Sequence, residues 1–197
     1  MSDLSRAQLK HQQRIDELCA ASIRALTGNA DLHFRGQRLH HGPAPLPSFA
    51  PHLHPAHDAS NTNSGNSLDA FRGAADGLAM RLAHSDATLH AALAPADAVA
   101  RLVFDLLEQI RAEACAPARW PGLRRNLRQR FEQWSLAYHH SGLNESARGI
   151  LLYTTAQMCR SRVTGEPLLE LTEELIEGTR GMLVRHFGRE LYGLPQV

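Results

Sequence analysis

Ala98-Val-Ala-Arg-Leu-Val-Phe-Asp-Leu-Leu-Glu-Gln-Ile-Arg-Ala-Glu113 is the stretch that most clearly decides the fold of this chain. Its apolar side chains recur with the i, i+3, i+4, i+7 spacing that places them on one face of an α-helix. Upstream, Ala94-Pro95 followed by Asp97 suits a helix start. The stretch therefore predicts a helix that buries one apolar stripe, made of Val99, Leu102, Val103, Leu106, Leu107 and Ile110.

Helical patterns continue on both sides of this stretch. Upstream, the spacing predicts one helix over about 5–26, with Leu9, Ile15, Leu18, Cys19, Ile23 and Leu26 as its apolar positions, and one over about 68–93. Downstream, helices are predicted from about 123, from about 146 toward 164, and from Pro167, because Gly and Pro pairs separate the apolar patterns. No fixed-period repeat is present, so we expect a mainly α fold, a multi-helix bundle.

A short alternating segment follows the first predicted helix. Leu32-His-Phe34-Arg alternates, Gly36-Gln37 offers a turn, and Arg38-Leu39 begins a return strand. This pattern predicts a small β-hairpin near residues 31–40. An isolated two-stranded hairpin is barely stable in water, so it has to lie against the helices.

Composition divides the chain into four parts. Residues 1–40 hold the first helix and the hairpin, which we expect to pack on the bundle. Residues 41–67 form a loop rich in Pro, His and Asn, with few apolar groups to offset the entropy of ordering it, so we expect a surface loop with a mobile tip. Residues 68–188 form the main helical domain, and residues 189–197 form a C-terminal tail.

Charge and motif content exclude several function classes. The 197 residues include 21 basic and 20 acidic side chains, so the overall field favours neither nucleic acid nor an anionic membrane. No run approaches the roughly 20 apolar residues of a membrane span, and the three cysteines form no disulfide or zinc pattern, so we expect a cytoplasmic protein. Because there is no phosphate-binding loop and no catalytic elbow, we expect neither ATP hydrolysis nor catalytic residues in this chain.

The region 76–113 carries an unusual density of charged and histidine side chains. Arg101, Asp105 and Glu108 fall on the face of their helix opposite the apolar stripe. They can form a solvated face or, with Arg81, Arg111 and Glu113, a buried or partner-facing ionic network. The candidate partner-binding residues are Arg81, His84, Asp86, His90, Arg101, Asp105, Glu108 and Arg111.

Two histidine groups raise the question of a metal site. His84 and His90 lie about 240° apart on one continuous helix, which points them in different directions unless the helix breaks between them. His52, His54 and His57 lie in the Pro-rich loop, where ordering the chain around an ion offsets much of the affinity. We therefore assign no metal ligands, and keep cobalt binding through one of these groups as an alternative.

Arginines interleave with aromatic residues between 119 and 134. Phe131 and Trp134 fall on an apolar stripe and are predicted core residues, while Arg124, Arg125 and Arg128 form a basic outer face. That face suits an acidic protein partner or a carboxylate-rich ligand better than nucleic acid.

The charged region resembles the N-terminal region of the CobT family. The residues that carry the resemblance are Asp76, Arg81-Leu, His84-x-Asp86, Leu89-His90, Leu93-x-Pro95 and Ala100-Arg101-x-x-Phe104-Asp105-x-x-Glu108-Gln109-x-Arg111-x-Glu113. Gly122, Asn126, Leu127 and Thr164-Gly165 extend it, and Arg24-Ala-Leu-Thr-Gly28 looks like the start of the family pattern. The resemblance covers most of residues 5–165. The acidic linker and von Willebrand A domain of a full CobT are absent, which suggests an N-terminal domain or a shortened relative.

The resemblance implies a role in cobalt insertion during aerobic cobalamin synthesis. It implies a non-catalytic subunit, oligomeric in its complex, that docks to a CobS-like AAA+ ATPase and a CobN-like large subunit of an ATP-dependent cobaltochelatase. These partners would handle ATP with magnesium and the cobalt, and this chain would bind no cofactor. The alternatives are an interaction or regulatory module of another AAA+ and von Willebrand A system, and a cobalt-binding metallochaperone.

Overall fold

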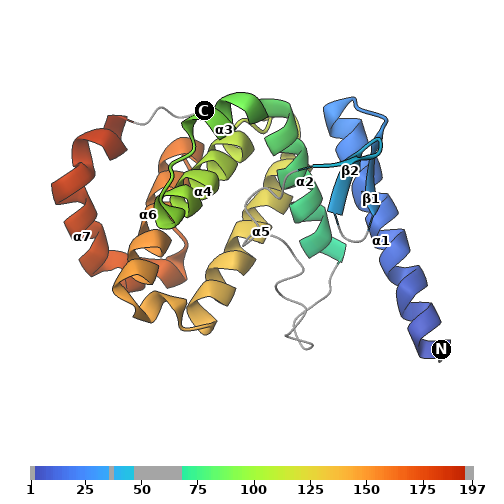
Figure 1. Cartoon of the computed structure of the whole chain (residues 1–197). Coiled ribbons are helices and arrows are strands. Elements are labelled where there is room, and N and C mark those ends of the chain that lie inside the picture. The colour runs from blue at the N-terminus through green and yellow to red at the C-terminus, as the bar shows by residue number, and fades with distance from the viewer. Residues whose placement is uncertain (1–2, 36–37, 47–67, 194–197) are drawn as a thin grey trace.

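The computed structural model describes residues 3–35, 38–46 and 68–193. Within these ranges the fold is mainly α, with a small antiparallel sheet at one edge (Figure 1), which confirms the predicted fold class. The elements are α1 (Asp3–Thr27), β1 (Leu32–Arg35), β2 (Arg38–His41), β3 (Ala44–Pro45), α2 (Leu68–His84), α3 (Ala87–Leu93), α4 (Ala98–Ala114), α5 (Pro121–His140), the 3-10 turn η3 (Leu143–Glu145), α6 (Ala147–Thr164) and α7 (Glu170–Gly193). None of the described helices is both long enough and apolar enough to cross a lipid bilayer.

Helix α1 and the sheet form the N-terminal edge of the molecule. Ile15, Cys19 and Ile23 recur every four residues and are buried against α2 and the hairpin. Leu9 and Leu18 were predicted in the same stripe, but both are exposed. Only the narrow face of α1 that carries Ile15, Cys19 and Ile23 is covered by other elements. The hairpin is confirmed, and β3 adds a third short strand that the sequence did not predict.

The predicted single helix over 68–93 is wrong, because the chain breaks at Ser85-Asp86. Helix α2 ends at His84, and the Asp86 carboxylate accepts hydrogen bonds from the backbone N–H groups of Thr88 and Leu89. An aspartate in this position stabilises a new helix N-terminus. Helix α3 therefore starts in a new direction and lies across the beginning of α4.

Helices α4 to α7 surround the larger core. Phe131 and Trp134 are buried there, as predicted, together with Leu106 and Tyr153. Ser146 caps α6 through the Gly149 N–H group, and Gly165 ends α6 with a left-handed φ of 70°. Helix α7 packs on α6 at the edge opposite α1, and it continues to Gly193, beyond the predicted end at residue 188. The predicted loop over 41–67 is wrong at its start, because β2 extends to His41 and Ala44–Pro45 pair with it as β3; residues 47–67 lie outside the described residues.

Gly73 and Gly77 mark the closest approach of α2 to α5. A Cβ atom on Gly73 would lie 2.8 Å from the backbone oxygen of Asn126 and 2.9 Å from Cβ of Arg130. A Cβ atom on Gly77 would lie 2.9 Å from the guanidinium carbon of Arg130 and 2.9 Å from Oε1 of Glu113. Side-chain carbons almost never come this close to other atoms, so a side chain at Gly73 would collide with the α5 backbone, and one at Gly77 would have to displace the Arg130 and Glu113 side chains.

We expect Gly77→Ala to lower the free energy of unfolding by about 1–3 kcal/mol, because the added methyl group must displace the Arg130 and Glu113 side chains. Urea denaturation measures the change. Gly122→Ala is the matched control, since a Cβ atom at Gly122 meets nothing within 4 Å and alanine is the better helix former. Equal losses in the two variants would contradict the close-packing explanation.

Candidate functional site

Three polar side chains from three helices meet where α2, α3 and α4 converge. Arg81 of α2 is only 2% exposed, and its Nη1 donates to the backbone carbonyl of Asp105 on α4 at 3.4 Å. Its Nη2 lies 3.3 Å from Nδ1 of His90 on α3, whose Nε2 lies 2.7 Å from Oδ1 of Asp105. The His90 ring also stacks on Phe104, with 4.6 Å between ring centroids. These contacts hold α3 against α4.

Both ring nitrogens of His90 lie near the Arg81 guanidinium. Nη2 of Arg81 lies 3.3 Å from Nδ1 and 3.1 Å from Nε2 of His90, and Nε2 also lies 2.7 Å from Oδ1 of Asp105. Because a guanidinium only donates and a carboxylate only accepts, the imidazole bridges the two charged groups. Burial lowers the pKa of Arg81, and the negative charges of Glu108 and Asp105 oppose that shift. The arginine thus remains a buried cation balanced by two carboxylates.

Glu108 and Arg111 form the second part of the cluster, one turn further along α4. Arg111 donates from Nε to Oε2 of Glu108 at 2.6 Å and from Nη2 to Oε1 at 2.8 Å, which is a bidentate pair. The same Nη2 donates to the backbone carbonyl of His84 at 2.6 Å, and the Ser85 hydroxyl donates to Glu108. Glu108 and Arg111 therefore fasten the C-terminal end of α2 to α4.

The environment of Glu108 favours its ionised form. Burial raises the pKa of the carboxyl group, but hydrogen bonds from Arg111 and Ser85 and the charges of Arg111 and Arg81 outweigh burial and hold the pKa at about 2. The Glu108 side chain is 18% exposed, whereas that of Arg111 is 43% exposed. The pair thus lies at the margin of the interior, with its acidic member inside.

A third polar group, deeper in the interior, continues the same face of α4. Gln109 donates to the Gly77 carbonyl at 2.9 Å and to Glu113 Oε1 at 2.7 Å, and Glu113 forms an ion pair with Arg130 of α5. Sequence reasoning assigned Glu113 to the Arg111 network and missed Gln109 and Arg130. The spacing of Asp105, Gln109 and Glu113, each four residues apart, was the available signal for one continuous polar stripe.

The eight predicted partner-binding residues fall into two groups. Arg81, His90, Asp105, Glu108 and Arg111 converge in the cluster between α2, α3 and α4, so Asp105 and Glu108 belong to an ionic network and not to a solvated face. The side chains of His84, Asp86 and Arg101 are exposed around it. Arg101 donates from Nε to the Pro95 carbonyl at 3.1 Å, and the described residues show no ion pair between Arg101 and Asp105.

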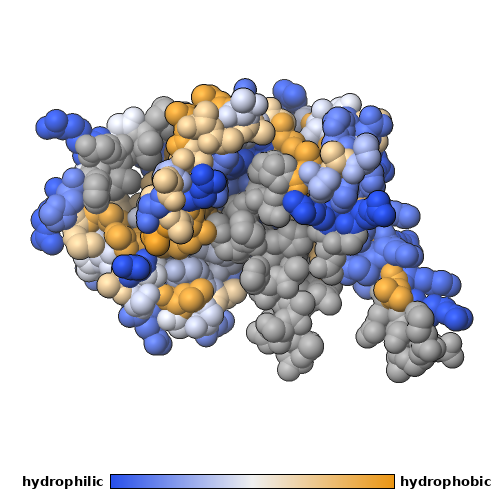
Figure 2. All heavy atoms as spheres, in the orientation of Figure 1, coloured by the Kyte–Doolittle hydropathy of each residue, from blue (hydrophilic) through white to orange (hydrophobic). Residues whose placement is uncertain are grey.

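An apolar surface lies directly above this polar cluster. Of residues 87–102, which cover α3 and the start of α4, none is buried. This segment contains seven alanines, three leucines and a valine, but only two charged residues, Asp97 and Arg101. Figure 2 shows apolar side chains gathered over α3 and the adjoining part of α4. We call residues 87–102 the apex; its most exposed large side chains are Leu89 (56%), Leu93 (62%), Val99 (49%) and Leu102 (37%).

The exposure of the apex corrects the predicted core of α4. Val99 and Leu102 were predicted to be buried in the same stripe as Leu106 and Ile110, and only the later part of that stripe reaches the interior. The physical reason is that the described elements leave the outer side of α3 and of the first turn of α4 uncovered, since none of residues 87–102 is buried. Contiguous exposed apolar surface of this kind marks binding sites in soluble proteins.

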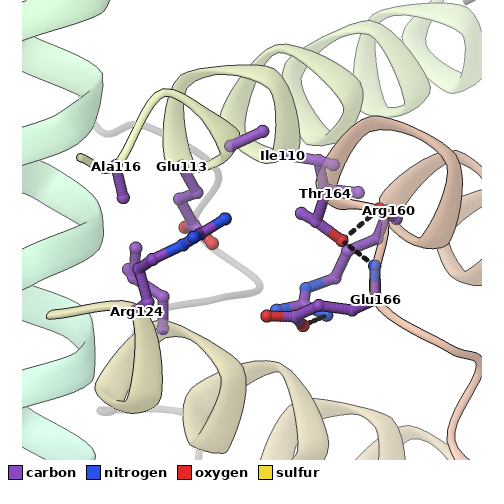
Figure 3. A pocket seen from close by; sticks show the side chains of 9 residues that line it. Ile110, Glu113, Ala116, Arg124, Arg160, Thr164 and Glu166 are labelled. Atoms are coloured by element: carbon purple, nitrogen blue, oxygen red, sulfur yellow. Dashed lines mark hydrogen bonds and ion pairs between the residues drawn. The ribbon is translucent and has the colours of Figure 1, made fainter. Parts of the chain in front are cut away.

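A small hollow between α4, α5 and α6 is a separate feature (Figure 3). Glu113 of α4 and Arg124 of α5 lie at one end of it, and Arg160 and Glu166, which are joined by a 2.7 Å ion pair, lie at the other. Each end of the hollow therefore carries one acidic and one basic side chain. This mixed lining favours no particular ligand, and the hollow is far smaller than an ordinary small-molecule site.

Histidine groups in the described ranges do not assemble with other ligands. The helix break places His84 and His90 on different helices, and His90 is engaged by Arg81 and Asp105. In the part of the chain that the structure describes, no three His, Cys, Asp or Glu side chains come together as a potential metal site. The loop histidines His52, His54 and His57 lie outside the described residues.

The family model for the cobalamin biosynthesis protein CobT matches residues 16–197. The chain belongs to the CobT family. No solved structure matches it. The CobT match covers the polar cluster, the apex and helices α4 to α7. The residues that carry the sequence resemblance include those that fix the geometry of α2, α3 and α4.

Protonation of Glu108 is expected to destabilise this CobT-family fold in acid. A carboxyl group whose pKa falls from 4.5 to about 2 on folding contributes stability that is present above pH 4.5 and lost as the pH falls toward 2. We expect roughly 2 kcal/mol of the unfolding free energy to be lost across this window, after a discount for solvent screening of the partly exposed pair. Urea denaturation between pH 5 and 2.5, compared for wild type and Glu108→Gln, measures it; an unchanged slope in the variant would contradict the assignment.

Removing the His90 ring is expected to release α3 while leaving the bundle folded. In His90→Ala, we expect amide hydrogen exchange over residues 87–93 to become roughly tenfold faster, the effect of losing about 1.4 kcal/mol of local contacts. His84→Ala is the matched control, because the His84 side chain is exposed at the adjacent end of α2. The account is wrong if both variants exchange alike over these residues.

Proposed function

We propose that this CobT-family chain is a non-catalytic adaptor of an ATP-dependent cobaltochelatase and that the apex is its docking surface for an AAA+ ATPase subunit. The single observation that carries the proposal is that none of residues 87–102 is buried, despite the apolar composition of this segment. Such a surface costs solubility unless a partner covers it, because apolar contact area drives protein association.

The rim of the apex has the polarity expected of a protein interface. His84, Asp86 and Arg101 surround the apolar surface with exposed polar side chains. Interfaces commonly place an apolar centre inside a polar rim, and the rim charges contribute mainly to orientation and association rate. His84, Asp86 and Arg101 thus remain direct partner-binding candidates.

The buried cluster supports docking indirectly, by fixing the orientation of α3. A seven-residue helix with no buried residue has little packing of its own, and isolated helices of that length do not form in water. Arg81, His90 and Asp105 supply the missing attachment, with Asp86 as the N-cap. The partner would meet a preorganised surface, which lowers the entropic cost of binding.

In this proposal the chemistry of cobalt insertion takes place on other subunits. A CobS-like ATPase would bind ATP with magnesium, and a CobN-like large subunit would bind the tetrapyrrole and the cobalt. The charged groups of the polar cluster are engaged with one another through the contacts described above, which suits a scaffold.

Polar substitution of the apex is expected to abolish docking without unfolding the chain. With Leu89→Ser and Leu93→Ser combined, we expect at least tenfold weaker co-purification with a CobS-like ATPase, while the circular dichroism spectrum and melting temperature stay near those of wild type because both side chains are exposed. Leu143→Ser is the matched control, since Leu143 is 54% exposed in η3, away from the apex. Undiminished association of the double variant would refute apex docking.

A further inference from the structure

We infer that two copies of this chain bind each other through unlike surfaces, the arginine-rich start of α5 in one copy and the glutamate-rich side of α7 in the other. Neither surface includes the apex or the Arg81 cluster, so the inference is independent of the proposed function. The occupant of each surface is a second copy of this chain because the chain itself carries both complementary charges.

The basic surface lies around the N-terminal end of α5. Arg119, Arg125 and Arg128 are exposed there, and residues 117–131 include no acidic side chain. Arg128 pairs with Glu132, whereas the described residues show no ion pair for Arg119 or Arg125. Trp120 is 36% exposed at the helix start, and the Arg119 guanidinium lies over it at 5.1 Å. This surface therefore combines uncompensated positive charge with a flat aromatic group.

The acidic surface lies along the first half of α7. At 100° per residue, the four glutamates of this segment fall within about 100° of arc, on a side distinct from that of the buried residues Thr172, Ile176 and Leu183. All four are exposed, and none takes part in an ion pair within the described ranges; they are Glu170, Glu173, Glu174 and Glu177. The helix dipole explains acidic residues in the first turn, but it does not explain Glu174 and Glu177.

Two glycines in α7 point to a partner on the same surface. Gly178 and Gly181 lie in the helix interior, continuing the acidic side, and a Cβ atom at either would meet nothing within 4 Å. Glycine weakens a helix relative to alanine, and no contact with another described residue requires it at either position. Exposed helix backbone beside the glutamates lets a flat side chain approach closely, and Trp120 of the second copy is such a group.

Several observations favour a protein carboxylate over a nucleic acid on the α5 surface. The net charge of the chain is only +1, so its field does not attract a polyanion. Nucleic-acid sites combine many phosphate contacts with several stacking rings, whereas this surface has a few arginines and the single ring of Trp120. The guanidinium fork matches a carboxylate in a bidentate geometry.

Charge reversal tests the inference with sedimentation velocity of the full chain in 50 mM salt. We expect self-association of wild type that weakens with salt, and at least about tenfold weaker association for Arg119→Glu with Arg125→Glu, and for Glu174→Arg with Glu177→Arg. An equimolar mixture of these two variants should associate again, because each supplies the charge that the other lost. A monomeric wild type at 100 μM, or a mixture that stays monomeric, overturns the inference.

Two further arms exclude other occupants. Gly178→Ala combined with Gly181→Ala should raise the melting temperature, since alanine favours helix, while weakening self-association. Unchanged association would mean that the two glycines are not at the contact, and it overturns their role in the interface.

A ten-residue glutamate peptide and a single-stranded DNA 20-mer are the probes for a foreign partner. Tighter binding of either probe than of a second copy overturns self-association, in favour of an acidic protein or a nucleic acid.

Discussion

The position of α2 against α4 and α5 is the constraint on which the rest of the structure depends. Gly73 and Gly77 allow the backbone of α2 to approach Arg130, and the buried pair of Arg130 with Glu113 lies over Gly77. Gln109 joins α4 to the same point through the Gly77 carbonyl. Because removing one partner of a buried ion pair leaves an uncompensated charge, these contacts fix the position of α2 strongly. The end of α2 then places Arg81 beneath α3.

The polar cluster connects this rigid arrangement to the exposed apex. Asp86 ends the helical path of α2 and starts α3, and His90 with Arg81 and Asp105 holds α3 across α4. The charged residues of the cluster therefore act between helices, where they orient an apolar apex. The polar cluster holds α3 in place, and the apolar apex faces solvent. This arrangement is the physical basis for the adaptor role proposed here for a chain that the CobT family model matches over residues 16–197.

Sequence patterns predicted α1, α4 and α5 well because each of these helices has an apolar stripe and a recognisable end. Ile15, Cys19 and Ile23 in α1, and Phe131 and Trp134 in α5, are buried as their spacing predicted. The apolar spacing did not reveal the helix break at Ser85-Asp86. The apolar residues of the short, exposed helix α3 continue the pattern of α2, so the sequence looks like one helix. The spacing also failed for Val99 and Leu102, because it shows which residues share a face but not whether another element covers that face. The roles of Gln109 and Arg130 depend on contacts between distant segments, which one sequence does not display.

Hydrogen exchange of the chain, alone and in complex with a CobS-like AAA+ ATPase, tests the central claim most directly. The account predicts that the ATPase slows exchange over residues 87–102 and leaves the already protected interior of α4, from Leu106 onward, unchanged. Protection confined to other surfaces, with residues 87–102 exchanging as fast in the complex as in the free chain, would contradict it.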